Sequence, residues 1–167
     1  MKLLLILLLL SSNYIFSQYK NTSGEALDKS FSDMVKWIRA DNETVLSSIE
    51  VSSEWKDFDL NQNDNYTIWI GHSTFLIKTD GVTILTDPIF SDRASPFSNI
   101  GPKRLIPPSM DINDLPNIDF VTVSHNHYDH LDVPTLKQLS KINPNTIFLI
   151  PAGDLKLLHR KGIKNAF

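Results

Sequence analysis

Three of the five histidines in the chain lie within one run of six residues, which reads His-Asn-His-Tyr-Asp-His from His125 to His130. Neutral imidazole and carboxylate are ligands suited to zinc, and also to iron or manganese. Residues two apart in an extended segment point the same way, so His125 and His127 can reach one ion together. Asp129 and His130 follow the expected bend and can reach a second ion. The run therefore predicts a site for two metal ions.

A histidine-rich surface turn that binds no metal is the alternative for this run. The position of the run favours a metal site, because it directly follows the apolar segment 120–124 and α/β folds place their sites at the carboxyl ends of strands. The chain contains no cysteine, so any metal site must be built from His, Asp and Glu. Two ions about 3.5–4 Å apart can supply a hydroxide at neutral pH, which predicts hydrolytic chemistry.

The composition is that of a single globular domain. The chain has 167 residues, 41% of them hydrophobic, and a formal net charge of −3. Disorder of the whole chain is excluded by this balance, and a large nucleic-acid footprint is excluded by the lack of a basic surplus. The absence of cysteine also excludes disulfide frameworks and cysteine nucleophiles.

The elements that must position the run form a mixed pattern of strands and helices. Apolar strands are expected at 66–70, 74–79, 82–86, 120–124 and 146–150, and Asp80-Gly81 is expected to form a hairpin turn. Helices are expected at 29–40, after Asp132 and Pro134, and at 154–160 with Gly162 as terminator, while 42–65 and the proline-rich stretch 88–116 should be irregular. This order predicts an α/β fold with a mixed sheet covered by helices.

The N-terminus has the pattern of a secretory signal peptide over residues 1–17. Lys2 precedes an unbroken apolar run from Leu3 to Leu10, and Ser17 is the small residue at the expected cleavage point. We therefore expect export to the periplasm or the cell exterior. The alternative is that the apolar segment anchors the protein. Residues 18–65 would then form an N-terminal helix and a polar connection ahead of the main domain.

The metal-site run resembles the signature of the metallo-β-lactamase superfamily. Five sequence segments, in this order along the chain, extend the resemblance: Trp69–Ile77, Leu85–Pro96, Gly101–Arg104, Leu115–Asp119 and Ser124–Asp132. Together they resemble the branch that contains N-acyl-phosphatidylethanolamine-hydrolysing phospholipase D and its bacterial relatives. The resemblance implies a four-layer αβ/βα sandwich with two Zn²⁺ ions, or Fe or Mn. It implies that His125 and His127 bind the first ion, and that Asp129 and His130 bind the second.

The resemblance also implies roles for residues around the metal. Asp129 would lie near the nucleophilic water as a catalytic residue. His72, in a Gly-His-Ser-Thr element, would be a supporting residue, and the alternative is a hydrogen-bonded turn histidine. Asp87, before Pro88, would orient a metal-bound imidazole, and the alternative is a carboxylate that anchors the turn. His159 is expected on a solvated helix face.

Downstream of the run, the sequence departs from the pattern of the superfamily. The remaining metal ligands of that fold come from a second, similar half. After His130 this chain offers only His159, Asp132 and Asp154, and none of them lies in a matching motif. Residues 66–167 therefore resemble the N-terminal part of such a domain. We expect this chain alone to bind metal weakly, to expose an apolar sheet face, and to be inactive.

The resemblance implies a metal-dependent phosphodiesterase acting on a phospholipid such as N-acyl-phosphatidylethanolamine. A lactonase or esterase of the same fold is one alternative, because the same metal chemistry serves carbonyl centres. A non-catalytic fragment is the other. A lipid substrate predicts an apolar surface near the site, and a sugar lactone predicts polar walls. The expected partner is a small-molecule or lipid substrate, and no nucleic-acid partner is expected. Contact with a membrane surface is possible in this interpretation, and the sequence assigns no oligomeric state.

Overall fold

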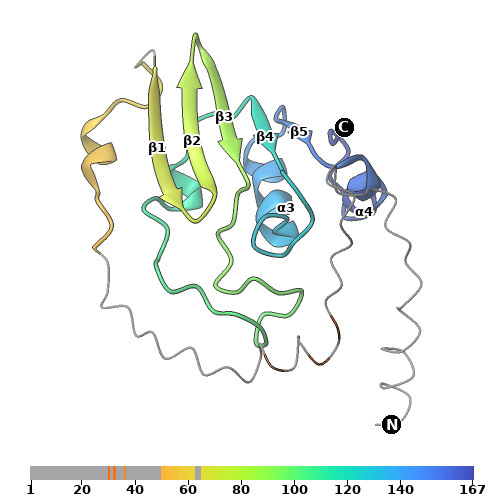
Figure 1. Cartoon of the computed structure of the whole chain (residues 1–167). Helices are drawn as coiled ribbons and strands as arrows, with labels where there is room; N and C mark the ends of the chain where they lie inside the picture. Colours follow the sequence, from red (N-terminus) through yellow and green to blue (C-terminus); the bar gives the residue numbers. More distant parts are fainter. Residues whose placement is uncertain (1–29, 31, 33–35, 37–49, 63–64) are drawn as a thin grey trace, which may run out of the picture. The chain divides into compact units, whose positions relative to one another are not determined.

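The computed structural model describes residues 30, 32, 36, 50–62 and 65–167 (Figure 1). The chain divides into two compact units, Met1–Val45 and Leu46–Phe167. The expected signal peptide lies outside the described residues, as does the expected helix 29–40 apart from residues 30, 32 and 36, so export and the domain boundaries stay predictions. In the part that is described, no helix is both long and apolar enough to cross a bilayer.

The second unit is built on one five-stranded sheet with the order β1-β2-β3-β4-β5 (Figure 1). The strands are β1 (Tyr66–Gly71), β2 (Thr74–Thr79), β3 (Val82–Thr86), β4 (Phe120–Thr122) and β5 (Ile147–Leu149). The first three strands pair antiparallel, and β3, β4 and β5 pair parallel. The predicted mixed sheet is therefore confirmed.

The hairpin between β2 and β3 forms where the sequence predicts it. Thr79 pairs with Val82, which leaves Asp80 and Gly81 as a two-residue loop. Both loop residues have positive φ, 48° and 80°. Such turns require this conformation because it matches the twist of the flanking strands, and Asp and Gly adopt it at low cost.

Two α-helices follow the parallel strands, as expected. They are α3 (Val133–Ile142) and α4 (Leu155–Arg160), and three short 3-10 helices are η2 (Glu54–Asp57), η3 (Ile112–Asp114) and η4 (Ala152–Asp154). Asp132 caps α3, since its side chain accepts a hydrogen bond from the Thr135 amide. The same carboxylate accepts from the amides of Phe90 and Ser91, which ties the irregular stretch after β3 to the start of α3.

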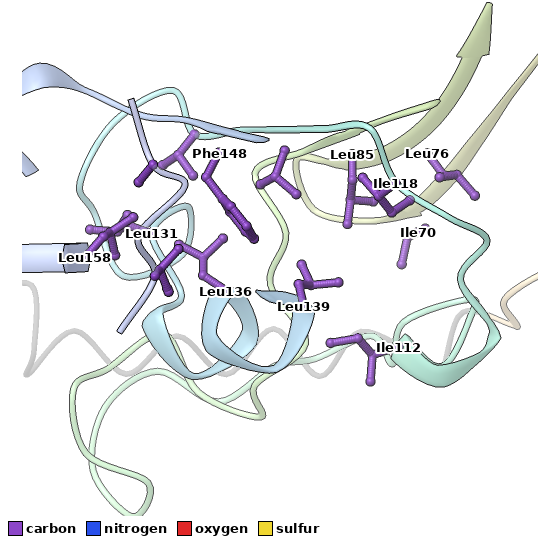
Figure 2. Packing of buried hydrophobic residues seen from close by; sticks show 14 of the residues in the cluster. Ile70, Leu76, Leu85, Ile112, Ile118, Leu131, Leu136, Leu139, Phe148 and Leu158 are labelled. Carbon is purple, nitrogen blue, oxygen red and sulfur yellow. The ribbon is translucent and has the colours of Figure 1, made fainter. Parts of the chain in front are cut away.

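One face of the sheet carries the hydrophobic core (Figure 2). The inward residues of four strands lie side by side in register: Leu76, Leu85, Val121 and Phe148. All four are fully buried. Leu136 and Leu139 of α3 and Leu158 of α4 pack against them and are equally buried (Figure 2). This packing fixes the ends of β3 and β4, where the predicted metal ligands begin.

The opposite face of the sheet is also apolar, but it is exposed. Because side chains alternate along a strand, Trp69, Phe75, Val82 and Leu149 point away from the core. Their exposed fractions are 44%, 37%, 37% and 43%. Half-buried residues lie between them on the same face: Ile77, Ile84, Phe120 and Ile147. The strands thus have the near-continuous apolar sequence of a sheet that is covered on both faces.

Strand β4 ends two residues earlier than the sequence predicts. Val123 still donates to the carbonyl of Leu149, but the amide of Ser124 donates to the carboxylate of Asp87 instead of to a neighbouring strand. The chain therefore leaves the sheet at Ser124, directly before the histidine run. The side chain of Asp87 thus takes the place of a strand carbonyl.

Candidate metal centre

The predicted site residues meet at one edge of the sheet. Strands β1, β3 and β4 run in the same direction, so the turn after β1, the end of β3 and the segment after β4 all lie at that edge. These three positions carry His72, Asp87 and the histidine run. The topology of the sheet therefore brings His72, Asp87 and the histidine run close together.

Asp87, which is buried, and Ser124, which is exposed, form the base of the site. The Ser124 amide donates to Oδ1 of Asp87 at 2.7 Å, and the Ser124 hydroxyl donates to Oδ2 at 2.8 Å. Nδ1 of His130 donates to the same Oδ2 at 2.9 Å. Burial raises the pKa of the Asp87 carboxyl, but the Ser124 amide, the His130 imidazole and the Ser124 hydroxyl together hold the pKa below its ordinary value. Asp87 is therefore an ionised acceptor that orients its neighbours.

These contacts determine which imidazole nitrogens are free to bind a metal. Because Nδ1 of His130 faces Asp87, its Nε2 is left to point toward Asp129, whose Oδ2 is 3.5 Å away. The Ser124 hydroxyl donates to Asp87, so it accepts from Nδ1 of His125 at 2.9 Å. Nε2 of His125 then faces Nδ1 of His127 at 3.1 Å. Each predicted pair of ligands thus presents two donor atoms to one point.

His72 contacts two of the predicted metal ligands directly. Its Nε2 is 3.1 Å from Oδ2 of Asp129. Its ring meets the ring of His130 edge-on, with centroids 5.1 Å apart. One donor atom each from His72, Asp129 and His130 lie within 4.8 Å of one another, as in a metal site. The donor set of imidazole and carboxylate fits zinc, iron or manganese.

Two site residues have positive φ, a backbone conformation that few residues with a side chain adopt. His72 has a φ of 50° and Asp87 a φ of 35°. Residues outside the favoured regions concentrate at functional sites, where the surrounding structure holds them in place. For His72 that support includes Trp69, whose Nε1 donates to the His72 carbonyl at 2.9 Å.

The structure brings the six predicted site residues together, and His159 lies outside the site, on an exposed helix face as expected. His72, Asp87, His125, His127, Asp129 and His130 all lie in the cluster described above. His159 lies on α4, exposed, with Nε2 3.2 Å from the carbonyl of Ala166, away from the cluster. Ser124 also belongs to the site, although the sequence assigned it only to a strand. Its position directly before His125 is the sequence signal that could have identified it.

A cavity of about 320 Å³ opens beside the cluster. His72 and Asp129 are among the residues that line it. The lining surface is mostly apolar and includes Trp69, Leu105 and Ile106, with Lys103 among the polar residues. The cavity therefore joins the predicted metal ligands to an apolar surface contributed by the irregular stretch after β3.

The Asp87 network predicts a pH-dependent stability. The pKa of Asp87 is lower in the folded chain than its ordinary value of about 4, so the ionised carboxylate stabilises the fold above that pH and this contribution is lost as the pH falls through the folded pKa. Asp87→Asn should lower the free energy of unfolding by about 1–3 kcal/mol at pH 7, since it weakens charge-assisted hydrogen bonds. Denaturant melts should show this difference shrinking as the pH falls below about 4.

Asp80→Asn is the matched control for this variant. Asp80 also has a positive φ, but it lies in the exposed hairpin turn, so its replacement should change stability little at either pH. A deficit of Asp87→Asn that is the same at pH 7 and pH 3 would contradict the ionised state of Asp87.

Comparison with known proteins places the site in context. Residues 67–165 match the family described as "Beta-lactamase superfamily domain". The chain is 39% identical over 124 residues to N-acyl-phosphatidylethanolamine-hydrolyzing phospholipase D 1 of Caenorhabditis elegans, a match that covers 74% of this chain and 35% of that protein. It is 28% identical over 100 residues to a UPF0173 metal-dependent hydrolase of Caldivirga maquilingensis, covering 60% and 37%.

Among solved structures, the chain is similar to Igni18, a metallo hydrolase from Ignicoccus hospitalis. The sequence identity is 21% and the TM-score 0.44, over 62% of this chain and 38% of that one. The chain therefore spans little more than a third of the length of each of these three proteins.

Proposed function

Since the chain belongs to the metallo-β-lactamase superfamily, we propose that the protein is a zinc-dependent hydrolase that cleaves a phosphodiester bond of a lipid. An N-acyl-phosphatidylethanolamine is the substrate class that the worm relative suggests. The observation that carries the choice of a lipid is the apolar cavity that opens on His72 and Asp129. Export of the protein, which residues 1–17 predict, is part of this proposal.

In this proposal His125 and His127 hold one ion, and Asp129 and His130 contribute to the other. When bound, the metal supplies a nucleophilic hydroxide near neutral pH and offsets the charge that develops on the phosphoryl oxygens. The Asp87 carboxylate and the Ser124 hydroxyl hold the rings of His130 and His125 so that the Nε2 atoms face the site. These two residues act through the histidines and do not touch the substrate.

Asp129 is the residue that we assign to the attacking water. Its side chain is 41% exposed and lines the cavity, so water and substrate can both reach it. The water oxygen forms a new bond to phosphorus, and the ester bond to the leaving alcohol breaks. Asp129 accepts a hydrogen bond from the attacking water and orients it. One proton of this water leaves with the alcohol, and the other stays with the phosphate. The products are a phosphomonoester and an alcohol.

The walls of the cavity favour a lipid over a soluble sugar lactone. A sugar ring presents hydroxyl groups, which need polar partners when they are removed from water. Most of the lining surface is apolar, with Leu105 and Ile106 among its residues, and an acyl chain gains about 0.8 kcal/mol for each buried methylene group. Lys103, at the same cavity, provides a positive charge suited to a phosphate.

Binding of substrate analogues tests this proposal. We expect the zinc-loaded chain to bind a non-hydrolysable phosphonate diester with a long acyl chain more tightly than its short-chain analogue or a sugar lactone. Leu105→Ser, at an exposed residue of the cavity wall, should weaken binding of the long-chain analogue about tenfold. Titration calorimetry measures both comparisons.

Phe97→Ser is the matched control for the cavity variant. Phe97 lies on the same irregular stretch and is 63% exposed, but it does not line the cavity. Its replacement should leave binding unchanged. Preferential binding of the lactone, or equal binding of long and short analogues, would favour the lactonase alternative.

A further inference from the structure

We propose that His72 is a metal ligand, and that with Asp129 and His130 it forms a three-residue site for one divalent cation such as zinc. This inference rests on the proposed function, because it concerns one of the two ions that the hydrolase would hold. The sequence alone assigns His72 a supporting role. The structure places it among the donors, on the turn between β1 and β2.

The spacing of the three donor atoms fits one ion. Nε2 of His72 and Nε2 of His130 lie 3.1 and 3.5 Å from the same oxygen, Oδ2 of Asp129. Ligand bonds of 2.0–2.1 Å arranged tetrahedrally separate neighbouring donor atoms by about 3.3 Å. Two imidazoles and one carboxylate are also the donor set of catalytic zinc sites that keep a fourth position open.

The orientation of His130 supports this arrangement. Its Nδ1 faces Asp87 at 2.9 Å, so Nε2 is the ring nitrogen that faces Asp129. A carboxylate on the other ring nitrogen is the usual partner of a metal-bound histidine, and it raises the basicity of the ligand. At His72, Nε2 is likewise the nitrogen that faces Asp129.

The direction of the His72 ring supports its role as a ligand. The backbone of His72 has a φ of 50°, which histidine adopts more readily than most residues, and its side chain is 48% exposed, so burial in the core does not account for the position of the ring. The Trp69 indole holds the His72 carbonyl, and the His72 ring points to Asp129 and His130. The imidazole itself is therefore the part of His72 that the site uses.

The rival interpretation is that His72 only hydrogen-bonds to Asp129 and positions it. The two interpretations predict different results when metal binding is measured directly. A lost ligand changes the number of donors around the ion. A lost positioning residue weakens binding by about 10–100-fold and leaves the coordination unchanged.

The experiment uses the 167-residue chain with His127→Ala as the parent. This replacement leaves His125 without its partner donor, so the pair His125 and His127 no longer binds an ion. Cobalt(II) serves as the probe, because its visible absorption reports the number and type of ligands. Affinity is measured by competition with a chelator of known strength. His72→Ala and His72→Asn are compared with Asp87→Asn and with His159→Ala. Asp87 is not one of the three donors and reaches them through His130, and His159 lies away from the site.

We expect the parent to bind one cobalt ion with the intense absorption of a four- or five-coordinate site. Both His72 variants should lose more than about 100-fold in affinity and show the weaker absorption of a site completed by water. Asp87→Asn should lose affinity without that spectral change, and His159→Ala should match the parent. Thermal melts of the metal-free variants check folding, and His72→Asn guards against a fold defect since asparagine tolerates a positive φ.

An affinity and a spectrum of the His72 variants that match those of the parent would overturn the ligand role and leave the proposed function standing. A loss of affinity with an unchanged spectrum would assign His72 as a positioning residue and also overturn the proposal. A parent that binds no cobalt would overturn the proposed metal-dependent function itself.

Discussion

A chain in which His125, His127 and His130 are all replaced by alanine is expected to retain no zinc after dialysis, under conditions in which the unchanged chain retains it. The replacements remove both donors of the pair His125 and His127, and one of the three donors of the cluster His72, Asp129 and His130. No group of three His or Asp donors is then left among the described residues of the site. Elemental analysis of the dialysed proteins measures the bound metal.

The intermediate variants separate the two parts of the site. His125→Ala with His127→Ala should remove only the weaker ion, because that pair offers two protein donors and the other cluster offers three. His159→Ala should change nothing, since this histidine faces the carbonyl of Ala166 outside the site. Full retention of zinc by the triple variant would show that the ion is held elsewhere and would contradict the site as described.

The chain is also expected to self-associate through the exposed face of its sheet. Phe75, Val82 and Leu149 are 37–43% exposed on that face, with further apolar side chains between them. Contiguous apolar surface of this kind is removed from water by association. Replacing all three residues with threonine, which suits strands, should shift the chain toward the monomer in sedimentation velocity over a range of concentrations.

A second triple variant controls for exposed apolar residues in general. Phe97, Ile100 and Leu105 are 63–76% exposed, but they lie on the irregular stretch and not on the sheet. Their replacement with serine should leave the association almost unchanged. Circular dichroism checks that both variants keep the fold. A parent chain that stays monomeric at high concentration would contradict the association of this face.

The local elements of this protein could be predicted from sequence, because they depend on neighbouring residues. Alternating and continuous apolar segments marked all five strands, and Asp80-Gly81 marked the hairpin with its two residues at positive φ. Asp132 marked the start of α3, where its side chain caps the helix. Each of these signals lies within a few residues of the structure that it specifies.

The sequence by itself also determined the chemistry of the site, since the run from His125 to His130 contains imidazole and carboxylate at a spacing that suits metal ions. Only the tertiary structure decided how the run is held and extended. Ser124 and Asp87 are 37 residues apart in the chain, and Asp129 lies 57 residues from His72. No local pattern encodes such contacts. They arise because the sheet brings the ends of β1, β3 and β4 to one edge, which makes His72 a neighbour of Asp129.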